Sequence, residues 1–545
     1  VTPYTDIYYD PVSVPDYNSL YPSSMISHNL SHDTFITSDE YDNLEGREYR
    51  VVEFDNYMYV RVGKGETVEK VINKKEPKKY CKYVQPLTDE HGNIIDSTRG
   101  IVPKILQKLL FARKATRGKM KYSVVTTKDG SIHEGIYSEK DDGIVELEYF
   151  VVDELKKPKI KLNKDDIVSI KKKYNEFQIG ILDGLQLAYK VTANSLYGQI
   201  GASTSPIYWK DIAASTTAVG RNNLIFAKEY CIEHYPGCKV VYGDTDSLFI
   251  RFECKYPADH PTRPNEKMQG LDAVFESMRL CIKSAAEVTS HLPKPHNLEF
   301  EKVIYPFILL SKKRYVGNYY TEFKPSFYTN SMGIVLKRRD NAPIVKHIYG
   351  GVVNILMKDK SLPKSIKFVN ESLQNMIDEK YPIEKLLVTK SLRGYYKNPK
   401  QIAHKVLADR IGLREQGNKP GAGDRMNYAY IKNTNKKALQ GEKIETPEFI
   451  KNNNLKLDYG HYISNQIMKP LLQLFALELE NIKEFKDKQF YIKEYNDIKT
   501  LTWEQEIEKL KTKWPEPEKY NKKLEELRCK EVKALIFDKF LNELK

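Results

Sequence analysis

The chain of 545 residues is long enough for roughly two to four domains and a sizeable hydrophobic core. Hydrophobic residues make up 41% of it, and no apolar run approaches the roughly 18–20 residues of a membrane-spanning helix. We therefore expect a soluble globular protein with no membrane partner. Lysine and arginine number 87 against 73 aspartates and glutamates, and the net charge of +14 favours a polyanionic partner such as nucleic acid.

Six cysteines are spread along the chain without a Cys-x-x-Cys pair. This spacing argues against a zinc ribbon or an iron–sulfur site, and it lacks the density of a disulfide framework. A reducing, intracellular compartment is the expected location.

The first hundred residues have the composition of short strands and loops. Residues Val51–Phe54 and Tyr57–Val62 are β-prone, and the run Lys74–Lys79 is predicted to be a basic loop.

Two helices follow, separated by a segment of different character. Apolar residues recur every three or four positions from Ile101 to about Lys121, and again over about Phe177–Tyr197. Between them, residues 122–172 contain Asp129-Gly130 between Val-rich runs, which predicts a hairpin. This segment therefore reads as an insertion between two antiparallel helices.

The second half of the chain changes from strand-like to helical composition. Residues 239–253 and 298–320 are strand-like, and from about Ile344 the chain is mainly helical and charged. The last stretch, Trp503–Lys545, alternates Glu and Lys at helical spacing and is interrupted by Pro515 and Pro517. A solvated helical face is the expected structure there.

The most informative segment is residues 241–250, a tight turn that carries Asp244 and Asp246 between two apolar strands. Carboxylates one residue apart point to the same side of an extended chain, so both could face one divalent cation, and hard oxygen ligands suit Mg²⁺. The alternative is a surface hairpin whose acidic residues only serve the turn. An EF-hand fits poorly, because its sixth and twelfth positions would be Phe249 and Lys255 instead of Gly and Glu.

A third carboxylate that could complete this site is Asp16, at the end of a predicted strand. Two-metal phosphoryl transfer uses carboxylates that bridge ions about 3.5–4 Å apart. We expect Asp16 and Asp246 to bridge two Mg²⁺ ions, for which Mn²⁺ can substitute, with Asp244 completing the set. Taken alone, the Asp16 segment is equally well a strand entering a turn.

The second predicted helix carries groups that suit a triphosphate. Lys190 and Asn194 are one turn apart on one face, and Tyr197 falls near that face. A lysine with an amide at i+4 can hold phosphate oxygens, while Tyr197-Gly198 could offer a flat surface beside a base pair.

The first predicted helix repeats this spacing with Arg113 and Arg117. Arginine forks suit phosphate oxygens. The alternative for a basic amphipathic helix is a solvated cationic face.

Four motifs in this order resemble those of family B DNA polymerases: Asp16-x-x-Ser-Leu-Tyr-Pro-Ser, Lys190-x-x-x-Asn-Ser-Leu-Tyr-Gly, Tyr242-Gly-Asp-Thr-Asp-Ser and Lys312-Lys-Arg-Tyr. Residues Ser19–Asp33 and Gly100–Thr116 look most like the replicative polymerases of large DNA viruses of eukaryotes, which in turn resemble the eukaryotic delta type. The similarity continues through Lys337–Asn341, Gly423–Arg425 and Asp458–Leu472, so it covers nearly the whole chain.

The resemblance implies a role for each matching residue. Asp16, Asp244 and Asp246 would be catalytic and hold the metals; Glu299 or Glu301 is a candidate further carboxylate, with a strand's solvent face as the alternative. Tyr21 would stack under the sugar and exclude a 2′-hydroxyl. The implied deoxynucleoside triphosphate contacts are Tyr17, Asn18, Ser19, Leu20, Tyr21, Arg113, Arg117, Lys190, Asn194 and Tyr197. The implied DNA contacts along the primer end are Gly198, Lys312, Lys313, Arg314 and Tyr315.

The chain also departs from the family pattern. Only fifteen residues precede Asp16, and no Asp-x-Glu, the carboxylate pair of the first exonuclease motif, is present. We expect no N-terminal or exonuclease domain in these residues and no proofreading by this chain alone. Either the sequence is a fragment or the exonuclease half is a separate polypeptide, and such a half and a processivity factor are candidate partners. Pro15 stands where an apolar β-former is usual, and it removes a ladder donor next to Asp16.

The expected fold is α+β, a right-hand polymerase core. An antiparallel-sheet palm would comprise residues 1–100 and about 203–343, helical fingers about 101–202 with the 122–172 insertion, and a mainly helical thumb 344–545. The implied function is template-directed DNA synthesis on primer–template DNA from deoxynucleoside triphosphates, in the nucleus, the cytoplasm or a viral replication site. The rival is a DNA-binding half that is inactive without its complement. Reverse transcription is disfavoured, because two adjacent aspartates would be expected at the hairpin.

Overall fold

The computed structural model describes residues 2–38, 41–42, 44–62, 70–140, 143–338, 340–435, 437–486 and 517–544. Helices and antiparallel sheets are both abundant, which confirms an α+β architecture. None of the helices in these ranges is both long and apolar enough to cross a membrane. Part of the predicted solvated C-terminal stretch, residues 503–516, lies outside the described residues.

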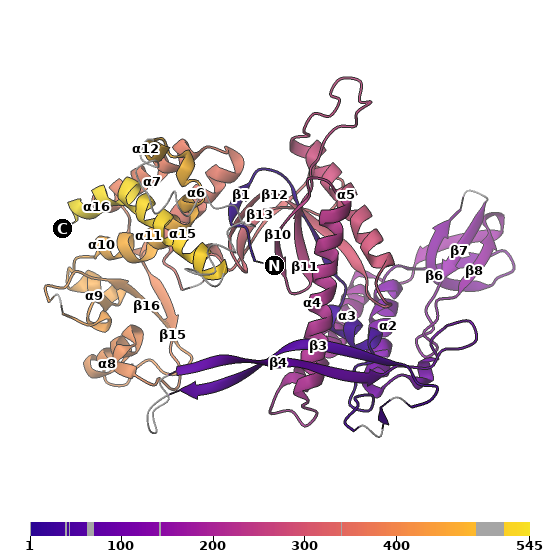
Figure 1. Ribbon diagram of the computed structural model, residues 1–545. Helices are drawn as coiled ribbons and strands as arrows, with labels where there is room; N and C mark the ends of the chain where they lie inside the picture. The colour runs from indigo at the N-terminus through magenta and orange to yellow at the C-terminus, as the bar shows by residue number, and fades with distance from the viewer. Residues whose placement is uncertain are drawn as a thin grey trace.

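A large antiparallel sheet forms the centre of the molecule (Figure 1). It joins two distant parts of the chain, because the early strand β2 lies between β11 and β12. The strand order is β10 (Lys239–Asp244), β11 (Ser247–Arg251), β2 (Val12–Tyr17), β12 (Leu298–Ser311), β13 (Arg314–Tyr320) and β14 (Tyr328–Met332), with β1 (Asp6–Tyr8) beside β12. These strands agree with the predicted ranges 239–253 and 298–320.

The two faces of this sheet differ, as period-2 alternation requires. Tyr17 and Ile250 pack with the helices α4 (Lys210–His234) and α5 (Gly270–Ser290) on one face. Val14 and Phe249 pack with an aromatic cluster on the opposite face. Asp16 is two residues after Val14, so it lies on the face away from α4 and α5.

Helices α2 (Ile101–Lys119) and α3 (Glu176–Gly201) pack against each other beside α1 (Leu20–Ser27), close to the predicted ranges. Pro103 stands in the first turn of α2, where no helical N–H is lost. A capping box between Asn175 and Gln178 starts α3.

The segment between α2 and α3 folds as a separate five-stranded antiparallel sheet with the order β8-β7-β6-β5-β9. Gly130 has φ +84°, so the predicted Asp129-Gly130 turn is confirmed. We call this unit the inserted sheet. Its elements are β5 (Tyr122–Thr127), β6 (Ile132–Glu139), β7 (Ile144–Glu148), β8 (Lys159–Asn163), η3 (Lys164–Asp166) and β9 (Ile167–Lys172).

The predicted basic loop Lys74–Lys79 is wrong. These residues belong to β4 (Lys70–Val84), which pairs with β3 (Tyr49–Val62) in a two-stranded ribbon along the lower edge of Figure 1. Lys75 pairs with Asp55 on the facing strand at 3.4 Å, and Lys79 with Asp211 of α4 at 2.7 Å. Both partners are distant in sequence, which is why the local composition misled the prediction.

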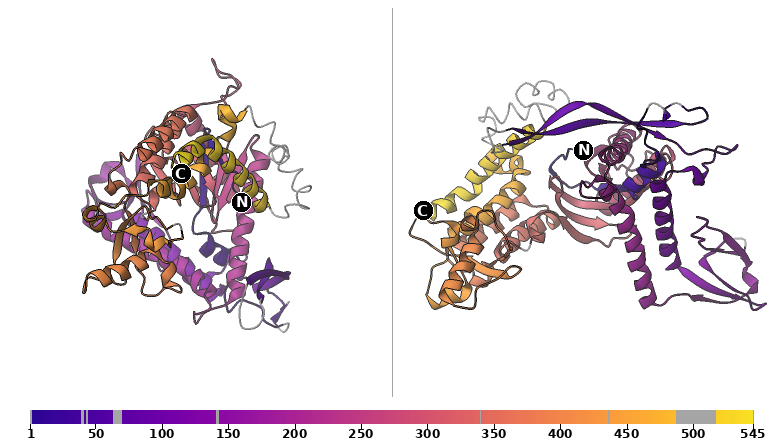
Figure 2. Two further views of the ribbon diagram at one scale, coloured as in Figure 1. Left: turned by 90° about the vertical axis from the view of Figure 1, so that its left-hand side faces the viewer. Right: turned by 90° about the horizontal axis from the view of Figure 1, so that it is seen from below.

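The remainder is mainly helical, as predicted, with one small three-stranded sheet, and it lies at the end of the molecule opposite α2 and α3 (Figure 2). The C-terminal helices present a buried face as well as the predicted solvated one, because Val532, Phe537 and Phe540 join the core. The longer elements are α6 (Pro343–Lys358), α7 (Leu362–Ile377), α8 (Ala403–Arg414), β15 (Val388–Ser391), β16 (Arg425–Tyr430), β17 (Ile444–Glu445), α9 (Pro447–Asn452), α11 (Met468–Ala476), α15 (Pro517–Val532) and α16 (Asp538–Glu543). The shorter ones are η2 (Asp96–Thr98), η4 (Val335–Lys337), η5 (Ile383–Lys385), η6 (Pro399–Gln401), η7 (Gln440–Glu442), α10 (Tyr459–His461), η8 (Tyr462–Ile467), η9 (Leu479–Asn481), α12 (Lys483–Lys486) and η11 (Lys533–Phe537).

Candidate active site

The β10–β11 turn brings Asp246 to the end of β2. Thr245 adopts φ +57°, and the Asp246 N–H donates to the Asp244 carbonyl at 2.6 Å. The Tyr17 N–H donates to the Asp246 carbonyl at 2.8 Å, which ties the turn to the residue that follows Asp16. Asp16 is also the register partner of Ser247. Two carboxylates more than two hundred residues apart in sequence are thus neighbours.

The electrostatics of the two carboxyls reflect this crowding. Burial and the charges of Asp246 and Glu301 raise the pKa of Asp16 to about 7. Burial, with the charges of Asp244 and Glu301, also raises the pKa of Asp246. Among the described residues no group of three or more His, Cys, Asp or Glu side chains forms a ready-made metal cage. The site is instead a pair of carboxylates whose repulsion a cation would relieve.

Asp244 has a different partner. Its carboxylate accepts from the Lys313 ammonium at 2.6 Å. Lys313 stands in the β12–β13 turn with φ +59°, and its N–H donates to the Tyr242 hydroxyl at 3.0 Å. Tyr242 therefore holds the turn that brings Lys313 to the carboxylates.

Pro15 is accommodated by an irregularity in the neighbouring strand. Phe300 pairs with Pro15 and Lys302 with Val14, so Glu301 is an extra residue in β12, a β-bulge. The bulge lies where Pro15 can donate no ladder hydrogen bond. Of the two predicted glutamates, Glu301 acts on the pKa of both Asp16 and Asp246, whereas Glu299 acts on Arg113.

Two of the implied triphosphate contacts that follow Asp16, Tyr17 and Asn18, have their backbone N–H groups occupied by other parts of the protein. The Tyr17 N–H is used by Asp246, its ring is buried, and the Asn18 N–H donates to the Asn297 carbonyl at 2.9 Å. In the described part of the chain, the N–H groups of Ser19, Leu20 and Tyr21 at the start of α1 donate to no protein acceptor. Those three N–H groups can donate to a ligand, whereas the N–H groups of Tyr17 and Asn18 form hydrogen bonds that stabilise the site.

Helix α3 faces this site. The Lys190 charge lowers the pKa of Asp16, which places the ammonium on the carboxylate side, and Asn194 is exposed one turn along. The rings of Tyr21 and Tyr197 meet at 4.4 Å between centroids. Gly220 of α4 lies against Leu20 and the Tyr21 ring, because a Cβ there would be 3.1 Å from the Leu20 side chain and 3.4 Å from the ring.

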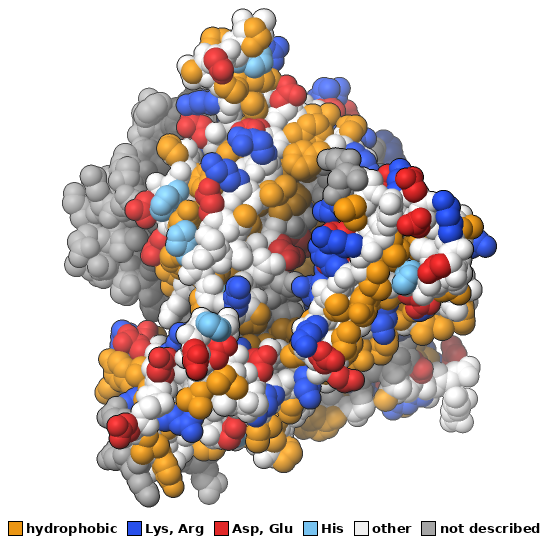
Figure 3. All heavy atoms as spheres, turned by 90° about the vertical axis from the view of Figure 1, so that its right-hand side faces the viewer, with side chains coloured by type: hydrophobic (Ala, Val, Ile, Leu, Met, Phe, Trp, Pro, Cys, Tyr) orange, Lys and Arg blue, Asp and Glu red, His pale blue; other side chains and the backbone are white. Residues whose placement is uncertain are grey.

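Arg113 and Arg117 of α2 line a cleft of about 750 Å³. The Arg113 Nε donates to the Gln186 side chain at 3.3 Å, and Arg117 is exposed. Asn18, Ser19 and Glu299 also line this cleft. Figure 3 shows Lys and Arg side chains gathered beside a hollow on this side of the molecule.

The residues predicted to contact the primer end of the DNA do not all lie at the same site. Lys313 faces the carboxylates, whereas Lys312 lines a second cleft with Gln473 and Arg528. Tyr315 is 8% exposed and packs on Phe249 and Phe307, so its direct contact with DNA is not supported by its position. Arg314 is half-buried, and Gly198 is exposed with open space around its Cα.

Two contributors went unnoticed in the sequence. The Lys302 ammonium donates to the Glu301 carboxylate at 2.8 Å, and its charge lowers the pKa of Asp16. The alternation of apolar and charged residues in Leu298–Lys302 is the sequence pattern that could have indicated this residue. Asn297, whose carbonyl anchors Asn18, had no sequence signal, because a backbone carbonyl is available at every residue.

Behind the site lies His296, which is 3% exposed. Its Nε2 is 3.0 Å from the Ser27 hydroxyl and 3.1 Å from the Asn223 amide, and its Nδ1 has no partner in the described part of the chain. Burial lowers the pKa of His296 from 6.5 to about 4. The folded protein therefore keeps this ring neutral at pH 7.

Stability should fall on acidification, because the unfolded chain protonates His296 below about pH 6.5 and the folded chain only near pH 4. The loss at pH 5 from this residue is about 2 kcal/mol. Urea unfolding at pH 7.5 and pH 5 should show a smaller pH effect for His296→Gln than for the wild type. The exposed His91→Gln should keep the full effect; an unchanged effect in His296→Gln would contradict the assignment.

Comparison with known proteins identifies the family. Residues 1–134 and 167–477 match the family described as DNA polymerase family B. A DNA polymerase of Pyramimonas orientalis virus is 44% identical over 538 residues, 98% of this chain and 41% of that protein. The DNA polymerase delta catalytic subunit of Candida albicans is 28% identical over 476 residues, 86% of this chain and 36% of that protein. The chain thus spans about two-fifths of the length of these relatives.

A solved structure supports the fold. The family B DNA polymerase from the archaeon Pyrobaculum calidifontis aligns with a TM-score of 0.51 at 22% identity, covering 87% of this chain and 46% of that one. The expected polymerase core and the resemblance to viral and delta-type enzymes are confirmed. The chain belongs to DNA polymerase family B.

Proposed function

We propose that this chain catalyses template-directed DNA synthesis, in which a primer 3′-hydroxyl attacks the α-phosphate of a deoxynucleoside triphosphate and pyrophosphate leaves. The observation that carries the proposal is the pairing of Asp16 with Asp246 at the end of β2, opposite Lys190 of α3. The names of the relatives, DNA polymerase and DNA polymerase delta catalytic subunit, support the same reaction.

Two Mg²⁺ ions, or Mn²⁺ in their place, fit these residues. Mg²⁺ is usually held by one or two carboxylates together with substrate phosphates, not by a complete protein cage. Burial and then the neighbouring carboxylates raise the pKa values of Asp16 and Asp246, and a bound cation would stabilise their charged forms. Asp16 and Asp246 would hold the ions, with Asp244 and Glu301 assisting. When bound, the metal supplies charge that favours the attacking oxygen and the triphosphate.

The protein groups position the substrate. Lys190 and Asn194 from α3, with Arg113 and Arg117 from α2, would hold phosphate oxygens together with the α1 N–H groups. The Tyr21–Tyr197 pair would form the floor under the sugar and the base pair. Lys313 would face the primer end, and with a primer bound it would release Asp244. Positioning and electrostatic stabilisation do most of the work in this reaction class.

We further propose a palm of residues 1–100 and 203–343, fingers of 101–202 and a thumb from 344. The sequence lacks Asp-x-Glu, so we propose that this chain does not proofread. A separate exonuclease half and a processivity factor remain candidate partners. All six cysteines are free, which suits a reducing compartment.

The test is primer extension by the full chain with Mg²⁺, primer–template and all four deoxynucleoside triphosphates. We expect extension that EDTA abolishes and Mn²⁺ restores. The rival is a DNA-binding half that needs its complement. It predicts DNA binding without extension, and extension only after a candidate exonuclease half is added. If the primer is extended neither by the chain alone nor by the chain with the exonuclease half, both the proposal and its rival are overturned.

Tyr21 should control the choice of sugar. Its ring packs against the Tyr197 ring and lies beside Gly220, so we propose that it occludes a 2′-hydroxyl. For Tyr21→Ala we expect the preference for dATP over ATP, as a ratio of kcat/KM, to fall roughly 10–100-fold. The exposed Tyr395→Ala is the control. An equal loss for both nucleotides in Tyr21→Ala would contradict this role.

A further inference from the structure

The cleft that contains Arg113 and Arg117 extends beyond the expected triphosphate position. One wall is the outer face of α2, a second is formed by Asn18, Ser19 and the segment Pro295–Glu299, and the third is the inserted sheet. The inserted sheet contributes Ile136, Phe150 and Leu155. These three residues lie outside the part of the chain that matches the family. The third wall is therefore a feature of the insertion.

The α2 wall is an uncompensated cationic stripe. Lys114 and Arg117 are three residues apart and share one face of α2, Lys121 follows two residues after the end of the helix, and all three are exposed and line the cleft. None of them pairs with a carboxylate in the described part of the chain. Five lysines in or beside the inserted sheet do pair with a glutamate of the same segment: Lys156–Glu154, Lys157–Glu148, Lys159–Glu146, Lys164–Glu139 and Lys173–Glu134.

The facing wall is apolar and fixed in place. The Phe150 ring fits over Gly118 of α2, where a Cβ would come within 2.2 Å of it, and lies 5.9 Å from the Phe111 ring. Leu155 lines the cleft, and its own backbone has φ +53°, a conformation that is strained for leucine. A strained apolar residue on a cavity wall points to a role in the cavity.

We propose that this cleft is a second nucleotide position, where a nucleoside triphosphate docks before it reaches Arg113 and the carboxylates. Its phosphates would lie along Lys114 and Lys121 and its base against Phe150 and Leu155, and Arg117 would be shared between this position and the inner site. The whole cleft, with the inner residues Asn18, Ser19 and Arg113 included, has a volume of about 750 Å³, within the range of about 300–1,000 Å³ that is common for ligand pockets. Arg113, Asn18 and Ser19 line the same cleft and connect it with the inner site. This inference rests on the proposed polymerase function, which makes the nucleotide a substrate.

The test is dTTP binding to the full chain without DNA, measured by equilibrium dialysis with Mg²⁺. For Lys114→Gln/Lys121→Gln we expect binding about fivefold weaker, since each lost charge contact contributes up to about 1 kcal/mol. The matched control Lys104→Gln/Lys108→Gln removes two charges from α2 outside the cleft, and it should bind dTTP like the wild type. In primer extension the KM for dTTP should rise by more than kcat falls.

Leu155→Gly separates function from folding. Glycine accepts the positive φ, so the melting temperature should not fall, while dTTP binding weakens. Equal dTTP binding in both double variants would overturn the proposal. So would a loss of primer–template binding with unchanged dTTP binding, which would make the cleft a DNA path. Equilibrium dialysis does not depend on catalysis, so it tests the nucleotide site separately from the polymerase function. If the wild type binds dTTP through Lys114 but extends no primer, the polymerase function is refuted and the nucleotide site is not.

Discussion

Asp246→Asn is expected to reduce primer extension by about 10³-fold or more, because it removes a charge worth several kcal/mol to the transition state. Asp16→Asn should have an effect of the same size. The two carboxylates are held together by the hydrogen bond between the Tyr17 N–H and the Asp246 carbonyl. Asparagine preserves side-chain size, so the backbone clamp and the fold should persist. Single-turnover extension at saturating dNTP measures the loss.

The matched control is Asp259→Asn, an exposed aspartate in the loop between β11 and α5. It should extend primers like the wild type. The Asp16 and Asp246 variants should also melt no earlier than the wild type in the absence of metal, because both substitutions remove like-charge repulsion. Extension at the wild-type rate by either variant would remove that carboxylate from the catalytic site.

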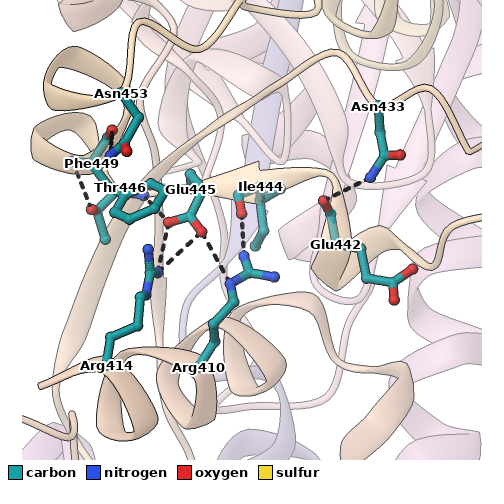
Figure 4. A network of polar contacts seen from close by, with 9 residues as sticks. All are labelled: Arg410, Arg414, Asn433, Glu442, Ile444, Glu445, Thr446, Phe449 and Asn453. Atoms are coloured by element: carbon teal, nitrogen blue, oxygen red, sulfur yellow. Dashed lines mark hydrogen bonds and ion pairs between the residues drawn. The ribbon is translucent and has the colours of Figure 1, made fainter.

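Glu445→Ala is expected to cost roughly 3–5 kcal/mol of unfolding free energy, because it leaves two partly buried guanidinium groups without their carboxylate partner. The side chain of Glu445 is 6% exposed, accepts hydrogen bonds from Arg414 of α8 at 3.0 Å, and forms an ion pair with the Arg410 Nε of the same helix at 3.0 Å (Figure 4). Arg410 also donates to the Ile444 carbonyl at 2.6 Å, and Arg414 lies 3.9 Å over the Phe449 ring. This network fixes α8 to β17 and α9.

An exposed ion pair provides the comparison. Glu384 and Lys451 are 3.3 Å apart with more than half of each side chain exposed, so Glu384→Ala should cost about 0–1 kcal/mol. Urea unfolding of both variants gives the two free energies. Similar small losses would show that the Glu445 network contributes no more than a surface pair.

Local pattern predicted the parts of the site that lie within one segment. The β10–β11 hairpin, α2 and α3 each follow from their own periodicity and turn residues, and four motifs in order identified the family. The prediction that Asp16 lies beside Asp246 depended on the resemblance to the family, because nothing in either segment alone shows that β2 lies next to β11.

Long-range pairing decided what the sequence could not predict. The run Lys74–Lys79 became a strand because its charges are matched across the ribbon and by α4. The bulge at Glu301 depends on Pro15 in another strand, and the N–H groups of Tyr17 and Asn18 are taken by distant carbonyls. Tyr315 was assigned by its motif to DNA, but its aromatic neighbours bury it. The sequence predicted the hairpin of the inserted sheet, but it did not predict that the sheet lies beside α2.

The most direct test of the account is single-nucleotide addition to a primer opposite a templating adenine. Each of the four deoxynucleoside triphosphates is supplied separately with the full chain and Mg²⁺, and both primer length and pyrophosphate are measured. The account predicts that only dTTP adds, with one pyrophosphate released for each nucleotide incorporated. Addition that ignores the template, or no addition with any of the four, would contradict it.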